Sequence, residues 1–309
     1  MTRPNRNRQT AVRPLPSLTL RPARSVVPLK NTSRLLHLGP LELPCPSVMG
    51  VLNVTPDSFS DGGRFAGIDA ARRHAEAMAR DGASIIDIGG ESTRPGAAAV
   101  SAAEELERVI PVINALRDTV DLPISVDTSK AVVMREAVKA GAALINDVMA
   151  LQEPGALQAV ADLGIPVCLM HMQGKPRTMQ ANPEYEQVTS DVKAFLRDRA
   201  ARCVEAGVAS DLIVIDPGFG FGKTHQHNVE LLANLRQFAD LEFPLLVGLS
   251  RKSTLGELTG RDVEDRLAGS ISAAVIAVMN GAQILRVHDI RETVDALRVA
   301  SAVLEAKND

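Results

Sequence analysis

The amino-acid sequence predicts an α/β protein built as a single TIM barrel, that is, a (β/α)8 barrel. From residue 48 onward, a short apolar run alternates with a longer segment of helical periodicity, which is typical of a parallel sheet wrapped by helices. Eight such units fit within about 260 residues, the usual span of this barrel. No low-complexity linker follows residue 40, which favours one domain.

The predicted strands are eight apolar runs, each short enough to cross a sheet once. Because they are separated by helical segments, consecutive strands are expected to be parallel neighbours. The runs are Val48–Val54, Ser84–Ile88, Pro123–Val126, Ala143–Asn146, Pro166–Met170, Leu212–Ile215, Pro244–Leu249 and Gln283–Val287.

The predicted helices follow the strands. Several are followed by glycine, the common signal for a helix C-terminus, as at Gly82, Gly141 and Gly164. The segments are Asp69–Asp81, Ala102–Arg117, Lys130–Ala140, Ala156–Leu163, Tyr185–Ala206, Val229–Phe238, Glu264–Met279 and Arg291–Leu304.

Composition and charge narrow the function classes. Of the 309 residues, 45% are hydrophobic and 23% are charged, which is typical of a globular chain with a sizeable core. The net charge of −3, the absence of Trp and the single Tyr argue against nucleic-acid binding. Polar residues interrupt the richest apolar stretch, Ala268–Ala282, well short of the roughly 18 residues that a membrane span needs. We expect neither nucleic acid nor membrane as a partner.

The first 34 residues differ from the rest of the chain. Residues 1–30 contain seven basic residues, five prolines and no acidic residue, so we predict a disordered basic extension over 1–34 and the barrel over 35–305. The extension lacks the apolar core of a secretory signal, although targeting or contact with a polyanion stays open. Cys45, Cys168 and Cys203 form no CxxC pair and are odd in number, which favours a reducing cytoplasm.

Polar side chains follow every predicted strand. In such a barrel the active site is assembled at the carboxyl ends of the strands and in the loops that follow. A polar or charged group at all eight ends therefore predicts an enzyme active site. The groups are Asn53, Asp87, Glu91 with Arg94, Asp127, Asn146 with Asp147, His171, Asp216, Ser250 with Arg251 and Lys252, and Arg286 with His288.

Two kinds of sub-site can be separated by chemistry. Asp127, Asn146 and Asp216 offer acceptors and an amide that suit a flat heterocycle bearing N–H groups, although Asp127 could instead cap the following helix. A second group is cationic and suits a phosphate or carboxylate, since an uncharged ligand would leave its charges uncompensated. Surface salt bridges are the alternative for each member. The group comprises Arg94, Arg286 and His288, with Arg251 and Lys252 nearby.

The glycine-rich run over 216–224 does not form a known nucleotide motif. Pro217 stands where a P-loop requires its first glycine, and Lys223 and His225 stand where a dinucleotide fold requires its third. The missing fingerprint also disfavours a doubly wound open sheet. We predict a flexible strand-to-helix loop with one exposed aromatic, Phe221, able to pack against a ring, with ordinary turn geometry as the alternative.

The remaining His and Cys residues carry weaker signals. Met170 and Met172 flank His171 with adaptable apolar surface. His225 and His227 are expected to face solvent, because no further ligand at metal spacing accompanies them. Cys168 is expected in the core, and the loops Thr55–Gly67 and Glu91–Val100 resemble lids over the barrel mouth.

Five stretches of the sequence indicate a protein family. Residues 49–63 and 89–96 closely resemble the two signatures of dihydropteroate synthase, and so do Asp216–Lys223, Ser250–Ser253 and Arg286–Asp289. The resemblance extends over roughly residues 35–305, with the motifs in order and at the right separations. It implies the same barrel fold and a transferase that joins 6-hydroxymethyl-7,8-dihydropterin diphosphate to p-aminobenzoate, with release of pyrophosphate.

The resemblance also implies a role for individual residues. The pterin pocket would comprise Asp127, Asn146, Asp216 and Lys252. The diphosphate would be held by Asn53, Arg94, Arg286 and His288, with Mg²⁺ at Asn53. The p-aminobenzoate site would comprise Thr93, Pro95, Phe221, Ser250 and Arg251. The catalytic residues would be Asp127, Lys252, Arg286 and His288.

The implied reaction is a dissociative displacement, in which the cations stabilise the departing pyrophosphate and Asp127 stabilises a cationic pterin. No general base is required, because the arylamine already carries a lone pair. Alternatives are a pterin-dependent methyltransferase domain, a non-catalytic pterin-binding paralogue and a generic phosphate-binding isomerase or aldolase. The family further suggests a homodimer that packs through the late helices, including 270–279.

Overall fold

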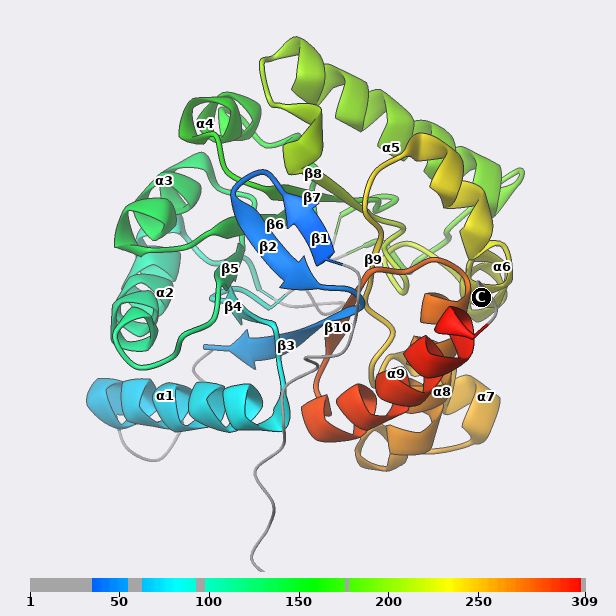
Figure 1. Ribbon diagram of the computed structural model, residues 1–309. Helices are drawn as coiled ribbons and strands as arrows, with labels where there is room; N and C mark the ends of the chain where they lie inside the picture. Colours follow the sequence, from blue (N-terminus) through cyan, green and yellow to red (C-terminus); the bar gives the residue numbers. More distant parts are fainter. Residues whose placement is uncertain (1–34, 55–62, 93–97, 176–177, 307–309) are drawn as a thin grey trace, which may run out of the picture.

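The computed structural model describes residues 35–54, 63–92, 98–175 and 178–306, with side chains in the first helix described from residue 67. Its centre is an eight-stranded parallel sheet in the order β8-β7-β6-β5-β4-β3-β10-β9. A parallel bridge between Ile215 and Leu245 brings β8 against the segment before β9 and completes the circle. The predicted barrel is confirmed (Figure 1).

All eight predicted strands form, within a few residues of the expected bounds. Each pairs with its neighbour in parallel, so that their carboxyl ends lie at one end of the barrel. The strands are β3 (Ser47–Asn53), β4 (Ile85–Gly89), β5 (Ile124–Asp127), β6 (Leu144–Asp147), β7 (Val167–Met170), β8 (Ile213–Asp216), β9 (Leu246–Val247) and β10 (Ile284–Val287).

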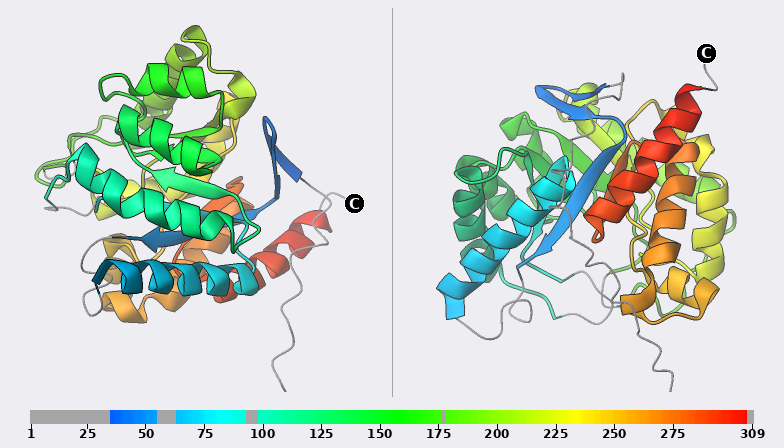
Figure 2. Two further views of the ribbon diagram at one scale, coloured as in Figure 1. Left: turned by 90° about the vertical axis from the view of Figure 1, so that its left-hand side faces the viewer. Right: turned by 60° about the horizontal axis from the view of Figure 1, so that its bottom comes forward.

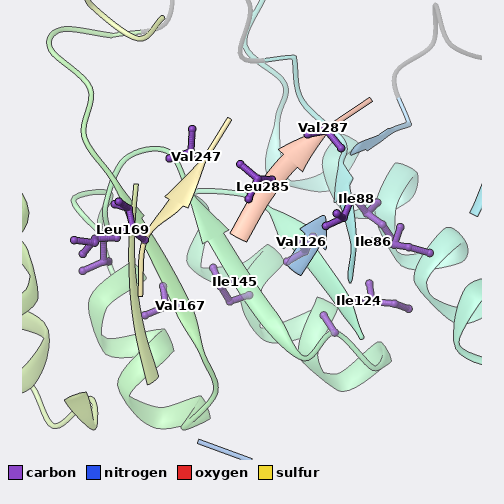
Figure 3. Packing of buried hydrophobic residues seen from close by; sticks show 14 of the residues in the cluster. Ile86, Ile88, Ile124, Val126, Ile145, Val167, Leu169, Val247, Leu285 and Val287 are labelled. Carbon is purple, nitrogen blue, oxygen red and sulfur yellow. The ribbon is translucent and has the colours of Figure 1, made fainter. Parts of the chain in front are cut away.

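Helices surround the sheet on the outside (Figures 1 and 2). Side chains such as Ile86, Val126 and Leu285 point outward from the strands and form the large core between sheet and helices (Figure 3). The helices are α1 (Gly63–Asp81), α2 (Ala102–Arg117), α3 (Ala131–Ala140), α4 (Ala156–Leu163), α5 (Val188–Glu205), α6 (His225–Ala233), α7 (Ser253–Thr259), α8 (Leu267–Met279) and α9 (Ile290–Glu305).

Several predicted helix bounds are wrong. Helix α6 begins at His225 rather than Val229, because Thr224 caps it by accepting a hydrogen bond from the His227 N–H at 3.1 Å. It ends at Ala233, and a 3-10 segment, Leu235–Leu241, takes the place of its expected last turn. Helices α1, α5 and α8 likewise begin at different residues from those expected, and α7 was not predicted.

An antiparallel hairpin, β1 (Leu35–Leu38) and β2 (Leu41–Pro44), was also not predicted. It lies across the amino-terminal end of the strands (Figure 1). Its apolar side chains, among them Leu38 and Leu43, pack onto inward-facing residues of the strands such as Ile85 and Leu144. The hairpin therefore closes the bottom of the barrel, and the opposite end is left for the site.

Within the described residues, no helix is both long and apolar enough to cross a membrane.

Candidate active site

The barrel interior is built in layers, because alternate residues of each strand point inward. A lower apolar layer includes Ile85, Leu144, Val214 and Ile284. Two residues further along the same four strands, the inward positions carry polar or charged groups. The upper layer, made of Asp87, Asn146, Asp216 and Arg286 together with Asp127 of β5, forms the floor of the barrel mouth.

The centre of this layer is the Arg286 guanidinium. Its Nε donates to Asp87 Oδ2 at 2.7 Å and its Nη2 donates to Asp127 Oδ2 at 3.0 Å. Asn146 Nδ2 donates to the same Asp87 oxygen at 3.1 Å. The side chains of β4, β5, β6 and β10 are thus joined in one network. The interpretation that Arg286 is uncompensated without an anionic ligand is therefore wrong.

Burial and charge set the protonation of this network. Burial raises the pKa of Asp127 to about 7, against the opposing influence of Arg286. Burial also raises the pKa of Asp216, although the nearby Lys252 opposes this shift. Burial lowers the pKa of Lys252 to about 8. Although burial works against its charge, Asp87 and Asp127 raise the pKa of Arg286. Two groups at the mouth therefore titrate near neutral pH.

Asp127 does not cap the next helix. Helix α3 begins at Ala131 with Lys130 at its N-cap, and no side chain caps it. Because the Asp127 carboxylate instead pairs with Arg286, the alternative interpretation is wrong.

Lys252 and Phe221 lie together on one side of the mouth. The Lys252 ammonium donates to the Phe219 carbonyl and lies 4.5 Å from the centroid of the Phe221 ring, a cation–π contact. Phe221 is half-buried rather than exposed, and it packs on a methionine-rich cluster that includes Met170 and Met179. The glycine-rich loop begins with the Gly218 N–H donating to Asp216 Oδ1 at 2.8 Å.

Ser250 contacts His288, another predicted site residue. Its Oγ accepts from the His288 backbone N–H at 3.2 Å, and His288 Nδ1 lies 3.1 Å from the same oxygen. Arg251 has a left-handed φ of 60° and its guanidinium pairs with Asp289, with Nε to Oδ2 at 3.1 Å. Its charge is thus compensated within the chain.

Asn53 lies at the rim, with an exposed side chain. Strand register places Asn53 beside Gly89, and Gly89 beside Asp127. A Cβ on Gly89 would lie 3.3 Å from Asn53 Oδ1, so the glycine keeps this corner open. Among the described residues, no group of three or more His, Cys, Asp and Glu side chains could hold a metal ion by itself.

Three predicted site residues, Thr93, Arg94 and Pro95, lie outside the described residues. The same holds for residues 55–62, which make up most of the first predicted lid loop, and for the central part of the second.

Two buried charged residues of the site were assigned to neither sub-site from the sequence, although Asp87 was named among the strand-end groups. Asp87 interrupts the apolar run Ile85-Ile86-Asp87-Ile88, and a carboxylate inside a buried strand is itself a signal. Lys223 ends the glycine-rich loop and is 2% exposed. Its place at the end of the family-like stretch Asp216–Lys223 was the available signal, although it did not indicate burial.

The outcomes for the other histidines and for Cys168 are mixed. His225 is exposed as predicted, but His227 is half-buried, completes the cap of α6 and lies edge-on to Tyr185. His171 is buried beside Met170 and Met172. Cys168 is fully buried in the lower layer, as expected.

Comparison with known proteins gives consistent matches. The family described as pterin binding enzyme matches residues 49–288. The dihydropteroate synthase of Escherichia coli (strain K12) is 55% identical over 269 residues, 87% of this chain and 95% of that protein. The Yersinia pestis dihydropteroate synthase, solved with a sulfonamide drug, has a TM-score of 0.83 and 53% identity over 88% of this chain and 100% of that one. The Xanthomonas albilineans enzyme with 4-aminobenzoic acid has a TM-score of 0.81 and 54% identity, over 85% and 95%.

The barrel and its polar upper layer define the class: a barrel enzyme whose mouth carries acids, an amide and cations. Since a relative 55% identical is matched over 87% of the chain, the chain belongs to the dihydropteroate synthase family. The resemblance found in the motifs is confirmed.

Proposed function

We propose that this chain joins 6-hydroxymethyl-7,8-dihydropterin diphosphate to p-aminobenzoate, forming 7,8-dihydropteroate and pyrophosphate. The observation that carries this proposal is the upper layer of the barrel in a chain of this family. It places carboxylates, an amide and a lysine around one guanidinium at the barrel mouth. A paralogue that only binds pterin would not require groups that stabilise both a positive charge on the pterin and a negative charge on the leaving pyrophosphate.

The pterin ring would be held by Asp127, Asn146, Asp216 and Lys252. Carboxylates accept hydrogen bonds from the ring N–H groups, whereas the Asn146 amide and Lys252 donate to ring oxygen and nitrogen. The buried Oδ1 of Asp87 has no hydrogen-bond partner among the described residues. The layer therefore has acceptor capacity left for a ligand or for water.

The diphosphate would be held by Asn53, Arg94, Arg286 and His288. A guanidinium has five N–H donors, of which Arg286 uses one on Nε and one on Nη2 for the two carboxylates. The remaining donors can bind phosphate oxygens while the carboxylates keep the side chain in place. Arg286 would thus bind the diphosphate without giving up its internal partners.

Mg²⁺ would be held at Asn53 together with the diphosphate. Mg²⁺ is usually bound by few protein oxygens and by substrate phosphates, so a single amide oxygen at an open rim fits this ion. When bound, Mg²⁺ neutralises negative charge on the diphosphate. No complete protein cage is needed.

The chemistry requires charge stabilisation rather than a strong base. As the C–O bond to the diphosphate breaks, positive charge spreads into the pterin, and the Asp127 carboxylate beside the ring stabilises it. Lys252, Arg286 and His288 would stabilise the opposite charge on the leaving group. The amine of p-aminobenzoate then attacks the carbon and loses its proton afterwards.

Two residues of β7 and the segment after it are unsuited to general-base or nucleophilic catalysis. Burial lowers the pKa of His171 to about 2, which leaves a weak base. Burial raises the pKa of Cys168 well above its usual value, which leaves an inert thiol. Both observations support a reaction without a catalytic dyad.

The p-aminobenzoate would lie against Phe221, beside Ser250, with Thr93, Pro95 and Arg251 completing its site. Lys252 Nζ lies 4.5 Å from the centroid of the Phe221 ring, which supports a location of this lysine between the two substrate sites.

The assembly would be a homodimer in the reducing cytoplasm. Leu258 of α7 is 63% exposed, and Leu267 and Ile276 of α8 are 38% and 45% exposed, which supports an apolar contact between copies at these helices. The three cysteines are free thiols, consistent with a reducing compartment. Light scattering of the purified protein tests the dimer.

Activity is tested by mixing the protein with pterin diphosphate, p-aminobenzoate and Mg²⁺, and by following pyrophosphate and dihydropteroate by chromatography. Release should require p-aminobenzoate and should collapse in Arg286→Ala and Asp216→Asn. Arg135→Met, which removes an exposed ion pair on α3, serves as the control and should keep full activity. Pterin binding without release of pyrophosphate would instead indicate a non-catalytic paralogue.

A further inference from the structure

Lys223 is a buried lysine that has no role in the proposed reaction. Its side chain lies beneath the loop that connects β8 to α6 and is 2% exposed. Nζ lies 2.9 Å from His171 Nδ1, 2.9 Å from the Gly218 carbonyl oxygen and 3.1 Å from the Phe221 carbonyl oxygen. An ammonium has three donors, so these three acceptors satisfy it completely.

None of these acceptors carries a charge. The carboxylate with the largest electrostatic influence on Lys223 is Asp216, at the start of the same loop. Burial lowers the pKa of Lys223 well below its usual value, opposed by Asp216. Such a group is costly to bury, and hydrogen bonds to surrounding polar atoms offset the cost.

The loop packs closely against the segment after β7. Its inward-facing carbonyls are therefore buried and need hydrogen-bond donors within the loop. A Cβ on Gly218 would lie 1.9 Å from the His171 carbonyl oxygen, and one on Gly222 would lie 2.3 Å from that of Gln173. Both glycines have left-handed φ values, 69° and 60°. The carbonyls of Gly218 and Phe221 are turned inward and both accept from Lys223, and the Gly218 carbonyl accepts in addition from the Phe221 N–H at 3.1 Å.

The imidazole of His171 completes the arrangement. Its low pKa keeps it neutral, so Nδ1 can accept from Lys223. The ring is fixed edge-on against Phe195, with centroids 4.8 Å apart. Tyr185 holds the end of the loop by donating to the Gly222 carbonyl at 2.7 Å.

The outer surface of this loop contacts the site. The Phe219 carbonyl accepts from Lys252, and the Phe221 ring lies under the same ammonium. We propose that Lys223 is a positioning residue, an internal hydrogen-bond donor that fixes the 217–222 loop so that Phe221 is presented to p-aminobenzoate. This inference rests on the proposed function for the identity of the substrate. Asp127 and Asn146 of the pterin pocket bond side chains of other strands rather than the loop.

The test replaces the ammonium by an apolar group of similar size, Lys223→Leu, and by an uncharged donor, Lys223→Gln. The KM for p-aminobenzoate should rise about tenfold or more in Lys223→Leu, the loss expected for a hydrogen bond to a charged group. The KM for pterin diphosphate should change less than threefold. Lys223→Gln should recover part of the loss, because its amide still donates to a carbonyl.

Methyl NMR of methionine gives a readout that is independent of turnover. Met170, Met172 and Met179 pack with Phe221, whereas Met49 and Met134 lie in other parts of the core. In Lys223→Leu, signals of the first three should shift and signals of the last two should stay. Shifts in all five would indicate a general structural role and overturn the proposal.

The two proposals fail in different ways. Unchanged methyl signals and an unchanged KM for p-aminobenzoate in Lys223→Leu would overturn the role of Lys223. A wild-type protein that makes no dihydropteroate would overturn the synthase assignment. If the cluster methyls still respond selectively in that case, the positioning of Phe221 by Lys223 stands without it.

Discussion

The Arg286 network makes a quantitative prediction about stability. Arg286→Met removes the guanidinium that pairs with Asp87 at 2.7 Å and with Asp127 at 3.0 Å. Asp87 is fully buried and Asp127 is 8% exposed, so water replaces the lost partner only in part. Two carboxylates on adjacent strands would then share one site without a cation.

Breaking a buried ion pair by removing one partner costs about 3–5 kcal/mol. For a chain of this size, each kcal/mol corresponds to roughly 2–4 °C in the melting temperature. We therefore expect Arg286→Met to melt about 6–20 °C below the wild type at pH 8. Arg286→Lys should lose less, because it keeps the charge and one of the hydrogen bonds.

The loss of unfolding free energy in Arg286→Met should become smaller as pH falls. Without Arg286, protonation of Asp127 relieves the repulsion, so the variant gains stability relative to the wild type as pH falls from 8 to 5. Urea unfolding followed by far-UV circular dichroism at both pH values measures the difference. Arg135→Met, at an exposed pair, should cost at most about 1 kcal/mol at either pH. A cost for Arg286→Met within that range, or one that is independent of pH, would refute the reasoning.

Three further predictions follow from the site. The kcat/KM for pterin diphosphate should rise with pH as Asp127 ionises near about 7 and fall as Lys252 deprotonates near about 8, and Lys252→Arg should move the descending limb to higher pH. Gly218→Ala should cost about 3 kcal/mol or more in unfolding free energy, because its Cβ meets the His171 carbonyl oxygen, whereas Gly164→Ala, at a similar φ with open space, should cost about 1 kcal/mol. Chelation by EDTA should abolish turnover while calorimetry still detects pterin binding, and added Mg²⁺ should restore the rate.

Each of these has a clear contrary result. A pH profile whose descending limb does not move in Lys252→Arg would assign that limb to another group. Equal costs at the two glycines would show that the loop can move away from His171. A rate that is insensitive to EDTA would remove Mg²⁺ from the proposal.

The sequence by itself determined the barrel and most of its rim. Eight apolar runs separated by helical periodicity allow few topologies other than a parallel barrel, and the polar residue at the end of each run then has to lie at one mouth. Asp127, Asn146 and Asp216 were found in this way, because strand ends are a local property. The long motifs then identified the family.

Tertiary structure alone decided which of these residues are partners. Arg286 and Asp87 are 199 positions apart in the chain, and their ion pair follows from the packing of β10 and β4 around one interior. Periodicity indicates that a residue faces inward, but it does not say which charge lies opposite. For the same reason the sequence did not predict the burial of Lys223. Its environment is formed by a carbonyl-lined loop and by a histidine 52 residues away. Burial and pairing depend on contacts between distant segments, and a local sequence pattern does not specify these contacts.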